Sequence, residues 1–197
     1  MKRIIQTTLL CLLVTVSISS CKKTTQGLRP VVTGKSGEIV VIINDALYEG
    51  SVGDTLKAVL NDTQIGLPQD ETLFDILQIS HNEFSSMFKT HRSILDLRVS
   101  SKVKENKISV KNELYAKTQS FMKIEAKSNK DMIQLLSENK NKIIAYFHIG
   151  ERERKIKVFK KNVVQEIFEK LKEKNNFTLS FPAGYTINKE ETDFLWV

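Results

Sequence analysis

Glu38-Ile39-Val40-Val41-Ile42-Ile43-Asn44 is the stretch that decides the fold of this chain. Five consecutive β-branched apolar residues stand between two polar ones. A strand with one face in water alternates apolar and polar side chains, whereas this run is apolar on both faces. It therefore predicts a short strand in the middle of a sheet, buried on both sides.

The elements after this strand follow from similar patterns. The spacing of Leu56, Val59 and Leu60 indicates a helix. Ser128-Asn-Lys-Asp131 resembles a capping box and opens a long helical pattern, which Gly150 is expected to bend or interrupt. The other predicted elements are strands over residues 72–80, 93–99 and 177–181, a short helix over 81–89, a hairpin over 108–115 and 120–126, and a final helix over 163–171.

This order of elements predicts an α+β fold, a two-layer sandwich with a mixed β-sheet and helices on one face. A ferredoxin-like βαββαβ arrangement is the specific topology that fits it best. Residues 37–197 are expected to form a single domain, which their number permits. The chain ends on Asp193-Phe-Leu-Trp-Val197, which is unusually apolar for a terminus. Either a closing strand or a domain truncated at its C-terminal end would explain it.

The N-terminal residues have the layout of an export signal. Met1-Lys2-Arg3 is cationic, the run from Ile4 to Val16 is largely apolar, and small residues follow. Ile18-Ser19-Ser20-Cys21 resembles the lipobox of bacterial lipoproteins, whose cysteine receives lipid on its sulfur and its new amino terminus. An uncleaved membrane anchor would need about 20 apolar residues, and an ordinary secretory signal would not need the cysteine. We therefore expect a signal peptide over residues 1–20, and a lipidated tether over 21–36 that attaches the protein to a membrane through Cys21.

Cysteine content excludes several kinds of chemistry. The chain has two cysteines. Cys11 lies in the predicted signal, and Cys21 would be consumed by lipid. The folded body is then left without disulfides, thiolate metal sites or a cysteine nucleophile. We expect no cofactor and no metal site.

Positive charge is concentrated in one short segment. The formal charge of the chain is +7, and it falls to +5 once Lys2 and Arg3 leave with the signal. Six basic residues lie within the ten positions from Arg152 to Lys161: Arg152, Arg154, Lys155, Lys157, Lys160 and Lys161. Such a patch can bind an anionic envelope component or an acidic protein partner. Nucleic acid is not an expected partner, because the predicted export signal takes the protein out of the cytoplasm. The simpler interpretation is a solvated helix face, because Glu151 with Lys155 and Glu153 with Lys157 are favourable i,i+4 pairs.

No catalytic set emerges from the residue spacing. The chain has three histidines, and neither a zinc-protease motif nor a serine-nucleophile elbow is present. The weak candidates for ligand binding are His91, Arg92 and Tyr185, because each is expected in or beside a loop at the end of a strand.

Several stretches together resemble an uncharacterised family of Gram-negative bacterial lipoproteins, a domain of unknown function. They are Thr33-Gly-Lys-Ser-Gly-Glu38, Gly66-Leu-Pro-Gln69, Phe88-Lys-Thr-His-Arg-Ser-Ile94, Pro182-Ala-Gly-Tyr185 and Asp193-Phe-Leu-Trp196. The resemblance implies a lipid-anchored α+β envelope protein with no known activity, of which this chain would be an N-terminal portion.

Two functions remain open from the sequence. The first is a non-enzymatic binding or assembly role at the cell envelope. The second is an envelope hydrolase whose site is completed by residues beyond Val197. By analogy with lipoprotein sorting, the absence of an acidic residue in Lys22-Lys23-Thr24-Thr25 predicts the outer membrane, facing the periplasm.

Overall fold

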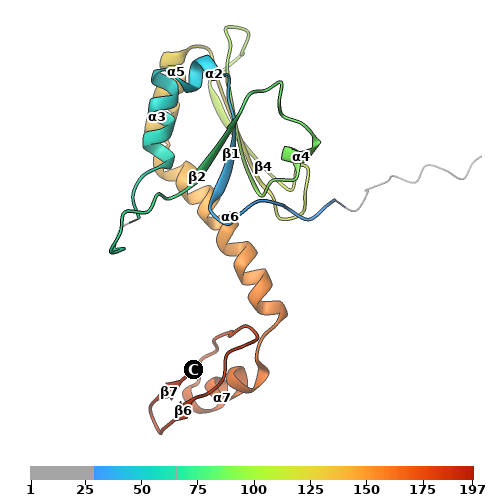
Figure 1. Ribbon diagram of the computed structural model, residues 1–197, viewed down its shortest axis with the longest axis vertical. Helices are drawn as coiled ribbons and strands as arrows, with labels where there is room; N and C mark the ends of the chain where they lie inside the picture. The colour runs from blue at the N-terminus through green and yellow to red at the C-terminus, as the bar shows by residue number, and fades with distance from the viewer. Residues whose placement is uncertain (1–28, 65) are drawn as a thin grey trace, which may run out of the picture.

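The computed structural model describes residues 29–64 and 66–197 (Figure 1). The predicted signal peptide and Cys21 lie outside the described residues. In chain order the elements are β1 (Glu38–Ile42), α2 (Asp45–Tyr48), α3 (Ser51–Leu60), β2 (Asp75–Ile79), α4 (Ser86–Lys89), β3 (Ser93–Val99), β4 (Lys107–Asn112), β5 (Ser120–Ala126), α5 (Asn129–Glu138), α6 (Lys140–Lys161), α7 (Gln165–Asn175), β6 (Lys189–Glu190) and β7 (Leu195–Trp196).

Strand β1 lies inside a five-stranded sheet of order β2-β1-β3-β5-β4. It is parallel to both of its neighbours, with Val40 opposite Leu77 on β2 and opposite Ile94 on β3. Ile39 to Val41 are fully buried, and burying one such side chain stabilises the fold by roughly 1.5–3 kcal/mol. The predicted buried strand is therefore confirmed.

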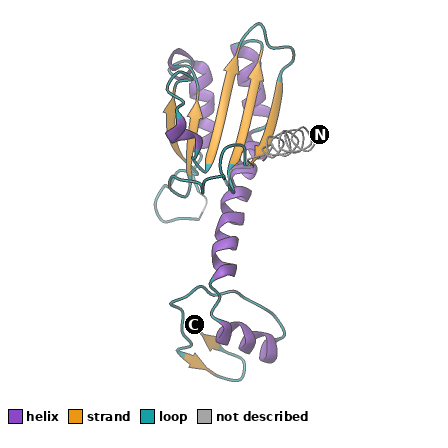
Figure 2. Ribbon diagram, turned by 90° about the vertical axis from the view of Figure 1, so that its right-hand side faces the viewer, coloured by secondary structure: helices purple, strands orange, loops and turns teal. Residues whose placement is uncertain are grey.

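The longer helices of the sheet domain cover one face of the sheet (Figure 2). Helices α3, α5 and the first half of α6 pack there around a core that contains Ile39, Leu56, Leu95, Leu136 and Phe147. Strand β5 is parallel to β3, and within the five-stranded sheet of the described residues β4 is the one strand that is antiparallel to its neighbour. The α+β fold with a mixed sheet and helices on one face is thus confirmed.

The topology differs from the ferredoxin-like arrangement. That order places a second helix before its last strand, whereas here β4 and β5 both precede α5 and α6. Strands β2, β1, β3 and β5 are consecutive parallel neighbours. The hairpin prediction over 108–126 was correct, but the partner of β5 beyond the hairpin is β3, which the sequence pattern does not reveal.

The other face of the sheet is covered by loops instead of long helices. Val40, Ile94 and Phe121 form a second buried cluster there, against which Phe84 and Tyr115 pack. Phe84 precedes the single turn α4, and Tyr115 belongs to the turn between β4 and β5. Of the short helix predicted over 81–89, only Ser86–Lys89 is helical. Phe84 and Phe88 pack against the sheet, whereas Met87 is exposed.

The long helical pattern breaks at Asn139 and continues through Gly150. The Ser128 hydroxyl accepts a hydrogen bond from the Asp131 backbone N–H, so the predicted cap of α5 is confirmed. Asn139 leaves the helical conformation, with φ −110° and ψ 14°, and its side-chain amide donates to the Leu135 carbonyl. Helix α6 then runs 22 residues without a break.

The second half of α6 extends away from the sheet and ends at the C-terminal lobe, residues 162–197 (Figure 1). Ile167 and Leu171 of α7 are buried in this lobe. Glu190 on β6 forms ion pairs with Lys170 and Lys174 of α7. Residues 177–181 are not the predicted strand, because only an isolated bridge joins Val163 to Pro182. That residues 37–197 form one domain stays a prediction.

The last part of the predicted tether is attached to the end of the sheet at which β3 and β5 begin. Val31 bridges to Lys117, and Thr33 bridges to His91. The Lys117 N–H donates to the Pro30 carbonyl over 2.9 Å. Residues 30–33 therefore cross the end of the sheet where the parallel strands β3 and β5 begin.

Candidate functional site

The candidate site lies where α6 crosses the first residues of β3 and β5. Gly150 allows this crossing to be close. A Cβ at Gly150 would lie 2.1 Å from the Ser120 hydroxyl oxygen, so any other residue would force a displacement. The helical glycine that sequence analysis treats as a break is thus a point of contact between α6 and β5.

Arg154, one turn further along α6, fixes this contact. Its side chain is buried, with 6% of the residue exposed. Nη1 donates to the carbonyl of Thr118 at 2.6 Å and to the Ser120 hydroxyl at 3.3 Å. Nη2 donates to the Ser93 hydroxyl at 3.2 Å. Arg154 therefore joins α6 to the starts of both strands.

Glu151 neutralises Arg154 inside the protein. Its Oε1 accepts from Arg154 Nη2 at 2.7 Å. Its Oε2 accepts from the Ser36 hydroxyl at 3.1 Å and from Arg92 Nη1 at 3.4 Å. Removing one partner of such a buried pair leaves an uncompensated charge, at a cost of about 3–5 kcal/mol. The expected Glu151–Lys155 surface pair is replaced by this buried pair with Arg154.

His91 is also held on both sides of its ring. Nε2 lies 2.6 Å from Glu38 Oε1, and Nδ1 lies 3.0 Å from the Ser93 carbonyl oxygen. The hydrogen bond with His91 is the main reason why the pKa of Glu38 is below its ordinary value of 4.5. The ring rests against Gly34, where a Cβ would lie 2.2 Å from Nε2 and where φ is +90°. His91 is 5% exposed and is committed to this packing.

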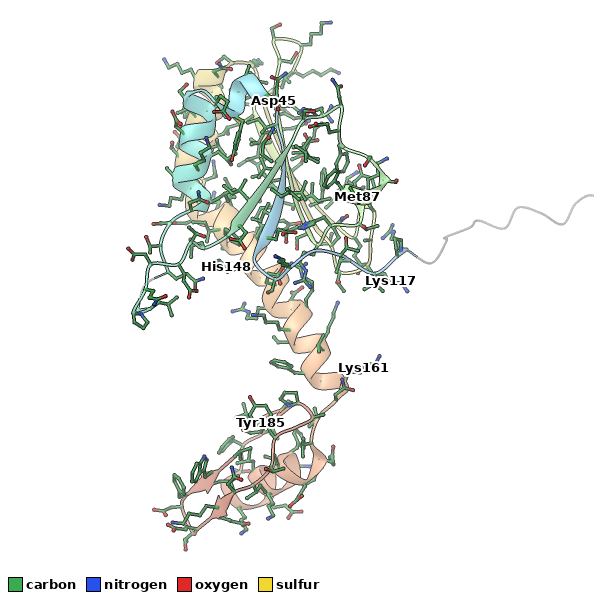
Figure 3. The ribbon with its side chains drawn as sticks, viewed as in Figure 1. Asp45, Met87, Lys117, His148, Lys161 and Tyr185 are labelled. Atoms are coloured by element: carbon green, nitrogen blue, oxygen red, sulfur yellow. The ribbon has the colours of Figure 1, made fainter. Side chains whose placement is uncertain are left out.

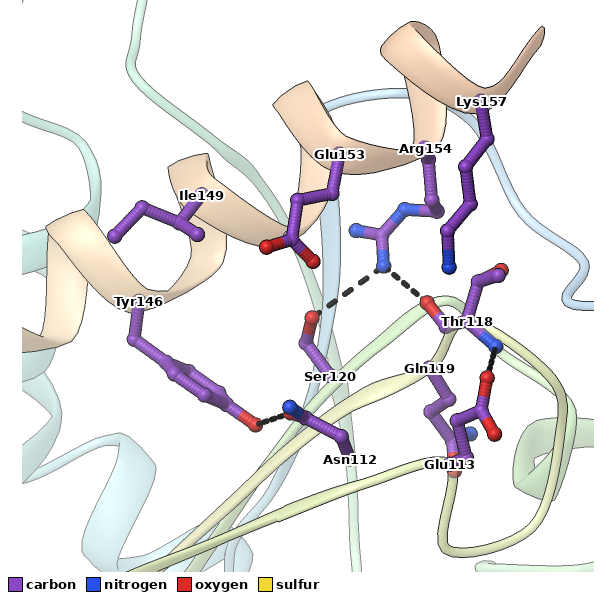
Figure 4. A pocket seen from close by; sticks show the side chains of 11 residues that line it. Asn112, Glu113, Thr118, Gln119, Ser120, Tyr146, Ile149, Glu153, Arg154 and Lys157 are labelled. Atoms are coloured by element: carbon purple, nitrogen blue, oxygen red, sulfur yellow. Dashed lines mark hydrogen bonds between the residues drawn. The ribbon is translucent and has the colours of Figure 1, made fainter.

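A cavity of about 400 Å³ opens beside Arg154 (Figure 4). One face of α6 forms one wall, and the β4–β5 turn forms the other. The Tyr146 hydroxyl has two acceptors within hydrogen-bond distance for its one hydrogen, Asn112 Oδ1 at 3.0 Å and the Phe121 carbonyl oxygen at 3.1 Å. Burial raises the pKa of Tyr146. The residues that line the cavity are Asn112, Glu113, Thr118, Gln119, Ser120, Tyr146, Ile149, Gly150, Glu153, Arg154 and Lys157.

The polar groups at this site are largely bonded to one another. The hydroxyls of Ser93 and Ser120 accept hydrogen bonds from Arg154, so neither is arranged as a nucleophile beside a base. Over the described ranges, no three His, Cys, Asp or Glu side chains form a group that could hold a metal ion. The arrangement is therefore suited to holding α6 rigidly on the sheet.

The structure brings together two of the three predicted ligand-binding residues. His91 and Arg92 lie next to each other at the start of β3, in contact with Glu38 and Glu151 respectively. Tyr185 lies in the C-terminal lobe (Figure 3), where it is 48% exposed and its ring centroid is 5.3 Å from that of Phe181. The three residues do not form one site.

Sequence reasoning missed the residues that matter most here. The charge pattern predicts that Arg154 and Glu151 lie on a solvated helix face, but both are buried. The i,i+3 spacing of Glu151 and Arg154 was a usable signal. So was Gly150, because a glycine inside a helical pattern often marks a close contact.

The fold and this junction define an α+β protein in which an ion-paired helix is fastened across the starts of parallel strands. The chain belongs to a family described as a domain of unknown function (DUF8532), whose model matches residues 32–160. The match begins within residues 30–33, which cross the end of the sheet where β3 and β5 begin, and stops one residue before the end of α6. No curated protein and no solved structure matches the chain significantly. Among the described residues, no helix is long and apolar enough to cross a bilayer.

Proposed function

We propose that this chain is a lipid-anchored protein of the bacterial cell envelope with a binding or assembly role. The observation that carries the anchoring is Ile18-Ser19-Ser20-Cys21, which follows a cationic and then apolar N-terminus. One acyl chain alone gives marginal, reversible membrane binding, and each further chain adds to it. Three acyl chains on one residue would therefore make the attachment effectively permanent. Lys22 follows the cysteine where an acidic residue would retain the protein at the inner membrane, so we place it at the outer membrane, facing the periplasm.

Two matched cysteine variants test the anchor. Cys21→Ala should abolish metabolic labelling with a fatty acid and release the protein from membranes. Cys11→Ala, in the preceding apolar run, should leave both properties unchanged. Labelling that persists in Cys21→Ala would contradict the proposal. Cleavage by protease added to intact cells would contradict the periplasmic orientation.

The binding role is supported by the way in which the candidate residues are used. Arg92, His91 and both serines at the strand starts are engaged in internal hydrogen bonds. The test introduces Tyr185→Phe or Arg92→Lys in place of the wild-type gene. If the residues were catalytic, the variant proteins would accumulate to normal levels but would fail to restore the function lost in a deletion strain. We expect both variants to complement a deletion strain, and loss of complementation by a correctly folded variant would favour the hydrolase.

A further inference from the structure

The second half of α6 carries an unusual concentration of unpaired positive charge. We call residues 152–161 the cationic arm. Arg152, Lys155, Lys157, Lys160 and Lys161 are exposed in it, and Glu153 is its one exposed acid. Within the described part of the chain, Arg154 is the arm residue that takes part in an ion pair. Like charges three or four residues apart on a helix, such as Lys157 and Lys161, repel one another. An anionic surface would therefore stabilise the arm.

The cationic arm starts at the end of the sheet that residues 30–33 cross. Arg154 Nη1 donates to the carbonyl of Thr118. The neighbouring Lys117 N–H donates to the carbonyl of Pro30, and Lys117 also bridges to Val31. Figures 1 and 3 show the arm and the described N-terminal segment at the same end of the sheet, where the arm runs downward and the segment runs to the right. Lys117 lies beside that segment, and Lys161 lies at the far end of the arm.

The length of the chain between lipid and fold limits the distance to the membrane. Eight residues lie between Cys21 and Pro30, so the two residues are nine steps apart and at most about 30 Å from one another when the chain is fully extended. The arm itself is about 15 Å long at 1.5 Å per helical residue. A bilayer held by Cys21 is therefore within reach of the edge from which the arm projects.

We propose that the cationic arm docks on the anionic phospholipid headgroups of the membrane that carries the lipid anchor. This inference rests on the proposed anchoring, because Cys21 brings the bilayer to this side of the protein. The apolar residues Ile156, Val158 and Phe159 are exposed but are too few for an apolar helix face, so the arm lies on the headgroups without inserting. Each cation near such a surface contributes about 1 kcal/mol before screening.

The test uses the chain from Lys22 onward, which contains every residue that the structure describes and carries no lipid. Its binding to phosphatidylglycerol vesicles and to phosphatidylcholine vesicles is measured by co-sedimentation. We expect binding to phosphatidylglycerol alone, weakening from roughly 0.05 to 0.5 M salt as the Debye length shrinks. The variant Arg152→Gln/Lys155→Gln/Lys160→Gln should bind on the order of a hundredfold more weakly at low salt, from about fivefold per cation.

A second triple variant provides the matched control. Lys102, Lys104 and Lys130 are exposed at the opposite end of the parallel strands, and their change to Gln removes the same charge. This variant should bind like the parent chain, and circular dichroism should show both variants folded. Equal loss in the two variants, or no binding of the parent chain to phosphatidylglycerol, would overturn the docking proposal. Because the tested chain has no lipid, either result leaves the anchoring to be judged by fatty-acid labelling.

Discussion

Arg154 on α6 donates a 2.6 Å hydrogen bond to the backbone carbonyl of Thr118, at the turn that leads into β5. The same guanidinium reaches Ser93 at the start of β3. One side chain thus fixes the direction in which the second half of α6 leaves the sheet. The orientation of the cationic arm and of the C-terminal lobe depends on this contact.

Replacement of Arg154 by Met should lower the free energy of unfolding by about 3–5 kcal/mol, because Glu151 would be left buried without its closest cation. Arg152→Met, two residues away on the exposed side of the same helix, should change it by less than about 0.5 kcal/mol. Urea denaturation of both variants measures the difference. Equal effects would show that the Arg154 contact is not important for stability.

Gly150→Ala should destabilise the protein by about 1–3 kcal/mol, because the new Cβ would overlap the Ser120 hydroxyl oxygen. Ser120→Ala removes that oxygen, so the double variant should be more stable than the sum of the two single effects predicts. Thermal denaturation of the four proteins completes the cycle. Additive effects would argue against the close contact between α6 and β5.

Glu38 should make stability depend on pH in the acid range. Its hydrogen bond with His91 holds its pKa below 4.5 in the folded protein. A carboxyl with a lowered folded pKa stabilises the protein above its unfolded pKa, and this stabilisation is lost as the pH falls through the folded pKa. The difference in free energy of unfolding between wild type and Glu38→Gln should therefore shrink as the pH is lowered below about 4.5. In a His91→Asn background this pH dependence should become much smaller, because the hydrogen bond with His91 is the largest cause of the lowered pKa of Glu38. An undiminished pH dependence there would contradict the assignment to His91.

Glu190 should titrate far below an ordinary glutamate. Its ion pairs with Lys170 and Lys174 lower its pKa from 4.5 to about 2. Carbon-13 NMR of the side-chain carboxyl should give a midpoint near that value. Changing Lys170 and Lys174 to Met should move the midpoint up toward 4.5, and an unshifted wild-type midpoint would mean that the α7–β6 contact does not form in solution.

The sequence predicts the sheet and its core because these depend on local patterns. The apolar run around Val40 and the alternation from Ser93 to Val99 identify buried strands, and Ser128 with Asp131 identifies the start of α5. Each of these signals lies within one element. Strand order is not set within one element, because the pairing of β5 with β3 depends on residues far apart in the chain.

The candidate site was harder to predict for the same reason. Glu151 and Arg154 lie in a segment whose charge suggests a solvated face, and their burial results from contacts with Ser36, Arg92 and Ser93. His91 and Arg92 were found because they precede a strand. The loop pattern alone predicts that Tyr185 belongs with them, but Tyr185 lies in the C-terminal lobe, beyond the end of α6.

The measurement that tests the central claim most directly is the mass of the mature protein extracted from membranes. The account predicts a chain that begins at Cys21 and carries acyl groups on that residue. The peptide containing Cys21 should show this added mass in tandem spectra, while peptides from residues 29–197 should be unmodified. A mature chain that begins elsewhere, or a Cys21 without lipid, would contradict the account.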